Sequence, residues 1–217
     1  AADVGIAMGQ TGTEVAKNTS DMVLVDDNFA TIVDAIAEGR NVYENVKKTI
    51  SFLLVCNFSE IVIMLFAQLV GWGVILTPIM LLLINLLGDG IPGLQLSNEV
   101  SDDSIMKNKP INRSASFFTK DVLKLLTRQI IACSAVTLIA YYIGAQMVVS
   151  IQFSPSSEIA QTMTFLTVGC TSILHIFNVR SQKSIFKTRL TTNPMLAGSA
   201  IVMIIIFALL VLTPLAP

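Results

Sequence analysis

Residues 49–70 read TISFLLVCNFSEIVIMLFAQLV, and residues 76–97 read LTPIMLLLINLLGDGIPGLQLS. Each run is mostly apolar over about 20 residues, the length that a helix needs to cross the hydrocarbon core of a bilayer. Each also contains a single acidic residue, Glu60 in the first run and Asp89 in the second. An ionised, unpaired acid in lipid costs at least about 3 kcal/mol, so both residues need an explanation.

Three further segments have the same length and composition, which gives five predicted spans. The spans are 49–70, 76–97, 129–149, 159–179 and 194–212. Hydrophobic residues form 53% of the 217-residue chain and charged residues 13%, which argues against a soluble single-domain enzyme. We predict a mainly α fold, a polytopic helical membrane bundle. The lipid bilayer is the expected partner, and the net charge of -1 argues against nucleic acid.

The basic residues predict the orientation of this bundle. All 14 Lys and Arg lie before the first span, between the second and third, or between the fourth and fifth. The connections at 71–75 and 150–158 contain none. Because Lys and Arg accumulate in cytoplasmic loops, we expect an integral membrane protein with a cytoplasmic N-terminus.

Residues 1–27 have a different pattern. Val4–Met8 and Met22–Val25 are short apolar runs, and the polar residues 11–20 between them favour a helix. The pattern predicts a strand, a helix and a second strand. A segment of about 27 residues is too short to form its own core. We interpret it as a short α/β remnant of a larger cytosolic domain.

Residues 28–48 predict a stalk helix that continues into the first span. Apolar residues recur at helical spacing from Asn28 onward, and no Pro interrupts the chain before Val70. Gly39 is the only weak point of this helix. A continuous helix of this kind could transmit movement from the cytosol to the bundle. Residues 49–217 then form the predicted transmembrane domain.

Two amides accompany the two buried acids. Asn57 precedes Glu60 by three residues and Asn85 precedes Asp89 by four, so each pair projects from one side of its helix. No Lys or Arg lies at a similar depth to neutralise the acids. We predict that these four residues are metal ligands, because carboxylate and amide oxygens suit calcium, magnesium or sodium.

Helix breakers surround Asp89 in the second span. They are Gly88, Gly90, Pro92 and Gly93. Unwound backbone is tolerated at membrane depth where it lines a cavity or binds an ion, so we expect the helix to be interrupted here. The alternative is that both acids are protonated and only bond neighbouring helices together.

The remaining polar and sulfur-containing residues give weaker signals. We expect Cys56, Cys133 and Cys170 to be small core residues, because each lies alone in an apolar stretch. His175, near the end of the fourth span, is interpreted as an interface residue whose hydrogen bonds are satisfied. No catalytic and no cofactor-binding residue is predicted.

Several longer motifs resemble one known family. They are ADVGIAMGQTGTEVAKNTSDMVLVDDNFATIV at 2–33, EGRNVYENVKKTISFLL at 38–54, DSIMKNKP at 103–110 and LHIFNVRS at 174–181, together with the Asn57/Glu60 and Asn85/Asp89 pairs. These motifs resemble the C-terminal part of P-type cation-transporting ATPases, in the calcium-pump branch (type II). The resemblance covers nearly the whole chain.

The resemblance implies that Asn57, Glu60, Asn85 and Asp89 bind calcium, the transported ion, in a pump driven by phosphorylation. Calcium pumps of animal reticulum usually have Thr where this chain has Gly88, and Glu where it has Ser172. We therefore expect one cation per cycle, with Asp89 as its central ligand. Glu60 would carry a counter-transported proton, because burial favours the neutral carboxyl.

Other parts of the family pattern do not occur in this sequence. The DKTGT motif with the phosphorylated Asp, the magnesium-binding GDGVND motif, the nucleotide domain and the first four spans are all missing. The resemblance thus implies a fragment of an ATP-hydrolysing translocase, whose missing N-terminal part binds ATP and magnesium. Overall likeness indicates a bacterial plasma membrane. The alternatives are a truncated, non-catalytic membrane protein, or a related pump for sodium, potassium or magnesium.

Overall fold

The computed structural model describes residues 3–99, 105–107, 109–110, 117–149, 158–180 and 193–212. The chain divides into two compact units. The first comprises Ala1–Glu44 and Ser101–Pro110, and the second comprises Asn45–Val100 and Ile111–Pro217. Each is described by itself below.

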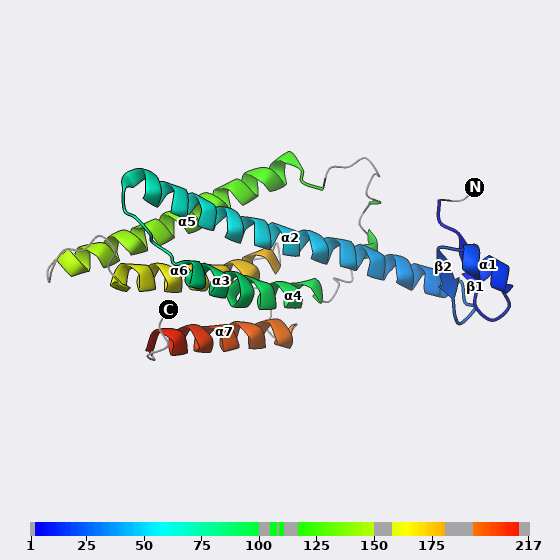
Figure 1. Cartoon of the computed structure of the whole chain (residues 1–217). Coiled ribbons are helices and arrows are strands. Elements are labelled where there is room, and N and C mark those ends of the chain that lie inside the picture. Colours follow the sequence, from blue (N-terminus) through cyan, green and yellow to red (C-terminus); the bar gives the residue numbers. More distant parts are fainter. Residues whose placement is uncertain are drawn as a thin grey trace. The chain divides into compact units, whose positions relative to one another are not determined.

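The first unit begins with the predicted strand, helix and strand. They are β1 (Ile6–Met8), α1 (Glu14–Thr19) and β2 (Met22–Leu24), and the two strands pair in parallel (Figure 1). The Thr13 hydroxyl accepts a hydrogen bond from the Ala16 amide at 3.2 Å and so caps α1. Ala7 and Leu24 are buried, whereas Ile6 and Val23 are exposed. Ile6 and Val23 lie on opposite faces, because Val23 pairs with Ala7 and successive side chains of a strand alternate. Each face of the sheet therefore has an apolar side chain that the described residues leave exposed.

Asp27 closes the loop that follows β1. Its carboxylate accepts hydrogen bonds from the backbone N–H groups of Gln10 and Thr11, each at 2.8 Å, and from the Thr11 hydroxyl at 2.7 Å. The residue has a φ of 52°, a left-handed conformation that Asp tolerates better than most side chains. These hydrogen bonds hold the pKa of Asp27 below its ordinary value, because they favour the charged form.

A single helix, α2 (Ala30–Val70), contains the predicted stalk and the first span. Its start is fixed by Asp26, which accepts from the Thr31 hydroxyl at 2.6 Å, and by Asn28, which accepts from the Ala30 amide at 3.0 Å. Gly39 does not interrupt the helix, which runs for 41 residues. The prediction of one continuous helix is confirmed.

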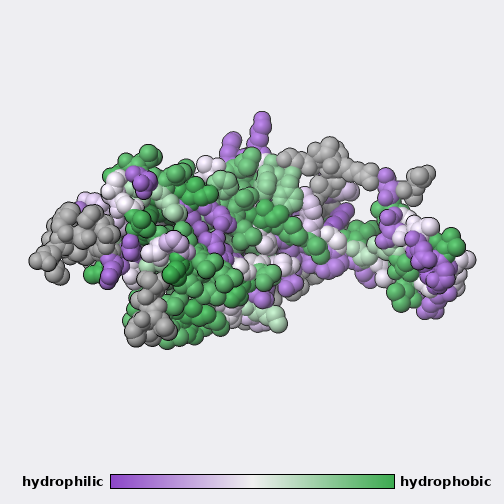
Figure 2. All heavy atoms as spheres, in the orientation of Figure 1, coloured by the Kyte–Doolittle hydropathy of each residue, from purple (hydrophilic) through white to green (hydrophobic). Residues whose placement is uncertain are grey.

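The second unit is a bundle of apolar helices. It contains the second part of α2, then α3 (Pro78–Leu83), η1 (Ile84–Gly90), α4 (Ile91–Ser97), α5 (Lys120–Val149), α6 (Glu158–Arg180) and α7 (Pro194–Leu212). The described residues include five helical stretches that are long and apolar enough to cross a membrane. The predicted fold class, a mainly α membrane bundle, is confirmed. Figure 2 shows hydrophobic side chains over much of the visible surface of these helices.

Two local details differ from expectation. The second span is not unwound around Asp89; it stays helical and widens into the π-helix η1 between α3 and α4. The helix α5 begins at Lys120, nine residues before the predicted start of its span. Its first turns contain several charged residues, so the apolar pattern that defined the span did not include them. The basic residues Arg113, Lys183, Lys187 and Arg189 lie outside the described residues. The predicted cytoplasmic placement of these loops stays a prediction.

α6 lies at the centre of the bundle and contacts α5, η1, α4 and α7 (Figure 1). Its contact with α7 depends on Gly169, where an added Cβ would lie 2.6 Å from the Phe207 ring. The expectation that all three cysteines are core residues is wrong for Cys170, which is exposed. Cys170 lies on the outer face of α6, where a thiol is apolar enough to meet lipid.

Candidate cation site

Glu60 and Asn85 meet between α2 and η1. The Asn85 amide donates one hydrogen bond to Glu60 Oε2 and another to the Leu81 carbonyl, both at 2.9 Å. These bonds use the amide hydrogens and leave its oxygen for a ligand. The second carboxyl oxygen, Glu60 Oε1, is buried and has no hydrogen-bond partner among the described residues.

Asp89 is the most buried acid of the bundle. Its side chain lies in η1, the residue is 1% exposed, and neither carboxyl oxygen has a hydrogen-bond partner among the described residues. Asp89 and Glu60 lie close enough for their charges to interact. Ser172 and Cys56 also face its carboxyl, although neither meets the geometry of a hydrogen bond. A buried acid without partners is costly, so Asp89 requires a proton or a ligand.

The π-helix explains how Asn85 and Asp89 reach this place. Pro92 has no N–H and removes one helical hydrogen bond just after Asp89. Gly90 allows close backbone contact, since an added Cβ would lie 3.3 Å from the Asn85 carbonyl oxygen. Single π-turns inside helices occur frequently at functional sites. The Gly and Pro residues therefore widen the helix where the acid is buried.

Asn57 does not join the other three residues in this structure. It is exposed, and its amide donates to the Leu53 carbonyl of its own helix at 2.8 Å. Glu60, by contrast, is 6% exposed. Residues three apart on a helix differ by about 60° in direction. Packing has turned Glu60 inward, which leaves Asn57 on the rim of that face.

Gly88 has a structural reason of its own. An added Cβ at Gly88 would lie 3.4 Å from the Phe207 ring, which also packs on Gly169. Phe207 thus occupies the space that a larger side chain at position 88 would need. Ser172 instead points toward the site, and its hydroxyl donates to Cys56 Sγ at 3.6 Å.

A third buried acid, Glu99, has a different environment. Its Oε1 accepts from Arg180 Nε at 2.7 Å, and its Oε2 accepts from the Asn193 amide at 2.9 Å. Its backbone carbonyl accepts from the Asn45 amide at 2.7 Å. Both carboxyl oxygens are therefore paired. Nothing in the sequence pattern indicated this cluster, because its members lie far apart in the chain.

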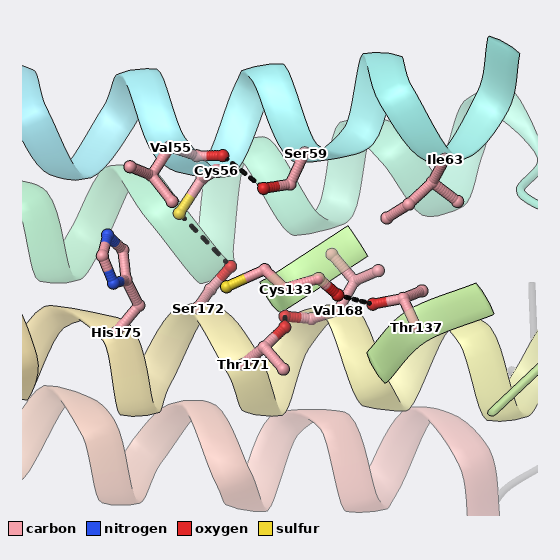
Figure 3. Close-up of a pocket in the computed structure, with 10 residues that line it drawn as sticks. All are labelled: Val55, Cys56, Ser59, Ile63, Cys133, Thr137, Val168, Thr171, Ser172 and His175. Atoms are coloured by element: carbon pink, nitrogen blue, oxygen red, sulfur yellow. Dashed lines mark hydrogen bonds between the residues drawn. The ribbon is translucent and has the colours of Figure 1, made fainter. Parts of the chain in front are cut away.

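His175 lies in a small cavity beside the site. Figure 3 shows Ser172 and His175 pointing from α6 toward α2, and Cys56 pointing back from α2. The His175 ring stacks on Phe52, with ring centroids 5.8 Å apart. Its Nε2 is buried and has no hydrogen-bond partner among the described residues. The expectation of a satisfied interface histidine is therefore wrong.

The side chains between α2 and η1 that lack partners among the described residues carry oxygen atoms. Among the described residues, no three His, Cys, Asp or Glu side chains gather closely enough to hold a metal. A cation between α2 and η1 would therefore depend on two carboxyls, Glu60 and Asp89, and on amide or backbone oxygens. Such an oxygen set suits calcium, sodium or magnesium better than transition metals.

A match to a known family model shows the family of the chain. The family model described as "Cation transporting ATPase, C-terminus" matches residues 73–217. The chain belongs to this family. The matched region contains Asp89, the whole of η1 and the rest of the chain as far as residue 217.

Curated relatives narrow the family. Calcium-transporting ATPase 1 of Bacillus cereus is 40% identical over 217 residues, which cover 93% of this chain and 24% of the relative. Calcium-transporting ATPase of Bacillus subtilis is 37% identical over 214 residues, which cover 98% of this chain and 23% of the relative. The predicted resemblance to the calcium-pump branch is confirmed. The chain spans about a quarter of the length of these relatives.

One further relative of this chain is named for a different ion. P-type sodium-transporting ATPase4 of Toxoplasma gondii is 46% identical over 121 residues, which cover 56% of this chain and 9% of the relative. Relatives named for calcium transport and a relative named for sodium transport thus both align with more than half of this chain. The choice of ion has to be argued from the site.

Proposed function

We propose that the chain is the C-terminal membrane part of an ATP-driven calcium pump and supplies its ion site. The observation that supports this most directly concerns Asp89, which is 1% exposed and whose two carboxyl oxygens have no hydrogen-bond partner among the described residues. A protein that needed Asp89 only for packing would gain by pairing it, as it pairs Glu99. The cation is the partner that this carboxyl lacks.

Asp89 is the central ligand in this proposal, with Glu60 and Asn85 beside it. Asn57 is the fourth ligand, and it joins when α2 rotates. The Asn57 and Glu60 side chains point about 60° apart, so a rotation of about half that angle would let both face the site together. The stalk makes such a movement possible, because α2 is one helix from Ala30 to Val70. One cation per cycle follows from Gly88 and Ser172, which offer fewer oxygens than Thr and Glu would.

Calcium is favoured over magnesium by the irregular donor set. Calcium accepts six to eight oxygens in flexible geometry, whereas magnesium demands a tight octahedron. A sodium pump is the second candidate function, because the sodium-transporting relative matches 46% of 121 aligned residues. Two carboxyls, Glu60 and Asp89, favour the divalent ion, since together they balance two positive charges.

A counter-transported proton on Glu60 completes the proposed cycle. Glu60 Oε2 accepts a hydrogen bond from the Asn85 amide, and Glu60 Oε1 has no hydrogen-bond partner among the described residues. In this proposal, Oε1 binds either a proton or the ion. Proton and cation therefore compete for one carboxyl. Transport of calcium in one direction would return a proton in the other.

ATP chemistry belongs to the remainder of the pump in this proposal. Residues 1–27 would form the end of its phosphorylation domain, whose other strands would cover Ile6 and Val23, exposed by 43% and 38%. Residues 28–48 would be the stalk and 49–217 the transmembrane domain, with the N-terminus in the cytoplasm. ATP and magnesium would bind to the preceding part of the same protein, in a bacterial plasma membrane.

ATP-driven uptake of radioactive calcium into inside-out vesicles tests the proposal. Vesicles that contain the full-length pump should accumulate calcium when ATP is added, and sodium should not replace it. A pump with Asp89→Asn should insert at normal levels and accumulate none. Uptake of sodium alone would support the second candidate. Absence of any cation uptake by the wild-type protein would contradict both.

A further inference from the structure

We propose that Phe207 is a positioning residue, whose ring keeps η1 at a fixed distance from α6 and so sets the size of the cation that the site accepts. This inference rests on the proposed function, because it concerns the selectivity of the ion site at Asp89. It starts from a juxtaposition: the ring of Phe207 in α7 lies against two glycines, Gly88 of η1 and Gly169 of α6.

The edge of the Phe207 ring fills a slot between two backbones. A Cβ added at Gly88 would lie 3.4 Å from ring Cζ and 4.0 Å from Cε2, and one added at Gly169 would lie 2.8 Å and 2.6 Å from the same atoms. Carbon atoms in good contact are about 3.5–4.0 Å apart, so position 169 has no room for a side chain. The same two ring carbons thus face both backbones, and their bulk keeps η1 and α6 apart.

The ring is held firmly in this slot. Phe207 is 2% exposed, and Phe165 of α6 packs against it edge to face, with ring centroids 5.2 Å apart and an interplanar angle of 84°. A phenyl ring is planar and rigid, whereas an aliphatic side chain can change rotamer and let two helices approach. Phe207 is therefore a spacer of fixed size.

Both glycines adjoin residues of the cation site. Asp89 follows Gly88 directly in η1. Ser172 lies three residues after Gly169, about 60° around α6, and it faces the Asp89 carboxyl. A change in the distance between the two glycine backbones would therefore change the distance from Asp89 to α6. Because selectivity between hard cations depends on the size and rigidity of their cage, the spacer affects which ion fits.

The π-helix makes the site sensitive to this contact. η1 is a single widened segment between two short α-helices, and such segments are rare. Its shape depends on the neighbours that pack against it. Phe207 packs against η1 at Gly88, one residue before Asp89. The contact involves no charged group, so Phe207 acts on the site through shape alone.

A residue with an ordinary core role provides the matched control. Leu196 also lies in α7 and is fully buried, but it belongs to a separate hydrophobic cluster with Phe52, Leu96 and Ile176. Leu196→Ala, like Phe207→Ala, leaves a cavity and should lower the thermal stability of the pump. Only Phe207→Ala should alter the selectivity of the cation site.

The test is equilibrium binding of radioactive calcium to the purified full-length pump, without ATP, in competition with unlabelled barium. Barium has the same charge as calcium and a larger radius. The measured quantity is the ratio of the barium Kd to the calcium Kd. Both constants come from the same sample, so the ratio does not depend on the fraction of the pump that is folded.

We expect Phe207→Ala to reduce the preference for calcium over barium. Calcium binding should weaken by about tenfold, the lower end of the effect of removing a residue that orients a metal ligand, and barium binding by less than about threefold. A looser cage suits the larger ion, so the Kd ratio should fall at least about threefold. Leu196→Ala should keep the wild-type ratio.

Gly169→Ala tests the slot from the other helix. Its Cβ would lie 2.6 Å from ring Cε2, so the ring has to move. The variant should be less stable and should have an altered Kd ratio. The double variant with Phe207→Ala should lose less stability than the two single losses combined, because the second change removes the obstruction. Additive losses would overturn the spacer role of the ring.

The outcomes separate this inference from the proposed function. Absence of calcium binding by the wild-type pump would overturn the proposed function and the spacer with it. Calcium binding by wild type, together with an unchanged Kd ratio in Phe207→Ala, would overturn the spacer alone. An equal fall of the ratio in Leu196→Ala would also overturn it, because any loss of core packing would then have the same effect.

Discussion

Asp89 and Glu99 lie ten residues apart on the same stretch of chain, and both are buried. Glu99 has a partner for each carboxyl oxygen, Arg180 Nε at 2.7 Å and the Asn193 amide at 2.9 Å. Asp89 has none among the described residues. A short stretch of chain thus contains one carboxyl that is paired within the fold and one that has no partner among the described residues.

The difference shows how a buried acid that stabilises the fold can be distinguished from one that binds a ligand. A paired acid stabilises the contact between helices, and its removal leaves a buried cation without a partner. An unpaired acid destabilises the protein until it binds something. Glu99 therefore belongs to the structure of the bundle, and Asp89 to its chemistry. Asp27, with its three hydrogen bonds, resembles Glu99.

The largest expected effect comes from Asp89→Asn. The change keeps the shape of the side chain and removes its charge, so the apparent calcium affinity of the full-length pump should fall by at least about 1,000-fold, or about 4 kcal/mol. The calcium concentration at the midpoint of calcium-dependent phosphorylation by ATP measures this affinity. Midpoints within threefold of wild type would break the comparison, because Asp89 would then be a packing residue.

Glu99→Gln should have the opposite profile. It leaves Arg180 buried without a carboxylate, which should destabilise the detergent-solubilised pump by about 3 kcal/mol. Calcium affinity should not change. Thermal unfolding measures the first quantity, and the double variant with Arg180→Gln should recover part of the loss. A drop in calcium affinity as large as that of Asp89→Asn would remove the distinction between the two acids.

Glu60→Gln should give an intermediate result. Gln can still accept the hydrogen bond that Asn85 now donates to Glu60 at 2.9 Å, so the helix contact should survive. The loss of one charged ligand should weaken calcium binding by about tenfold, or 1.4 kcal/mol. Wild-type affinity should rise with pH as protons cease to compete, and the variant should show a flatter profile. An unchanged pH profile would remove the proton-exchange hypothesis.

Asp27→Asn should have the smallest effect. The pKa of Asp27 is lowered from 3.8, so its contribution is complete above that pH and is lost as pH falls through the lower, folded value. Hydrogen exchange of the Gln10 and Thr11 amides, corrected for intrinsic rates, should be faster in the variant at pH 7. Transport should be unaffected. Equal exchange in both proteins would mean that Asp27 does not hold this loop.

Much of the fold could be predicted because it depends on local sequence. Twenty apolar residues define a span wherever they occur, and the uninterrupted helical pattern from Asn28 to Val70 predicted α2. The π-helix could not be predicted in detail. Gly90 and Pro92 indicated an interruption, but whether a helix unwinds or widens depends on the neighbours that pack against it.

The candidate site was predicted in composition and only partly in geometry. Glu60, Asn85 and Asp89 come together, whereas Asn57 is exposed, because the rotation of a helix is set by the packing of the whole bundle. The Glu99–Arg180 ion pair joins residues that are 81 positions apart, and a local sequence pattern cannot predict such a contact. The environment of His175 could not be predicted either, because the lack of a partner for its Nε2 among the described residues depends on how α2 and α6 pack.

Equilibrium binding of radioactive calcium to the purified full-length pump, without ATP, tests most directly whether Asp89 is kept unpaired for a cation. Wild type and Glu99→Gln should each bind one calcium per chain, and Asp89→Asn should bind none at the same free calcium concentration. One calcium bound by Asp89→Asn with wild-type affinity would contradict the assignment of this carboxyl as the central ligand.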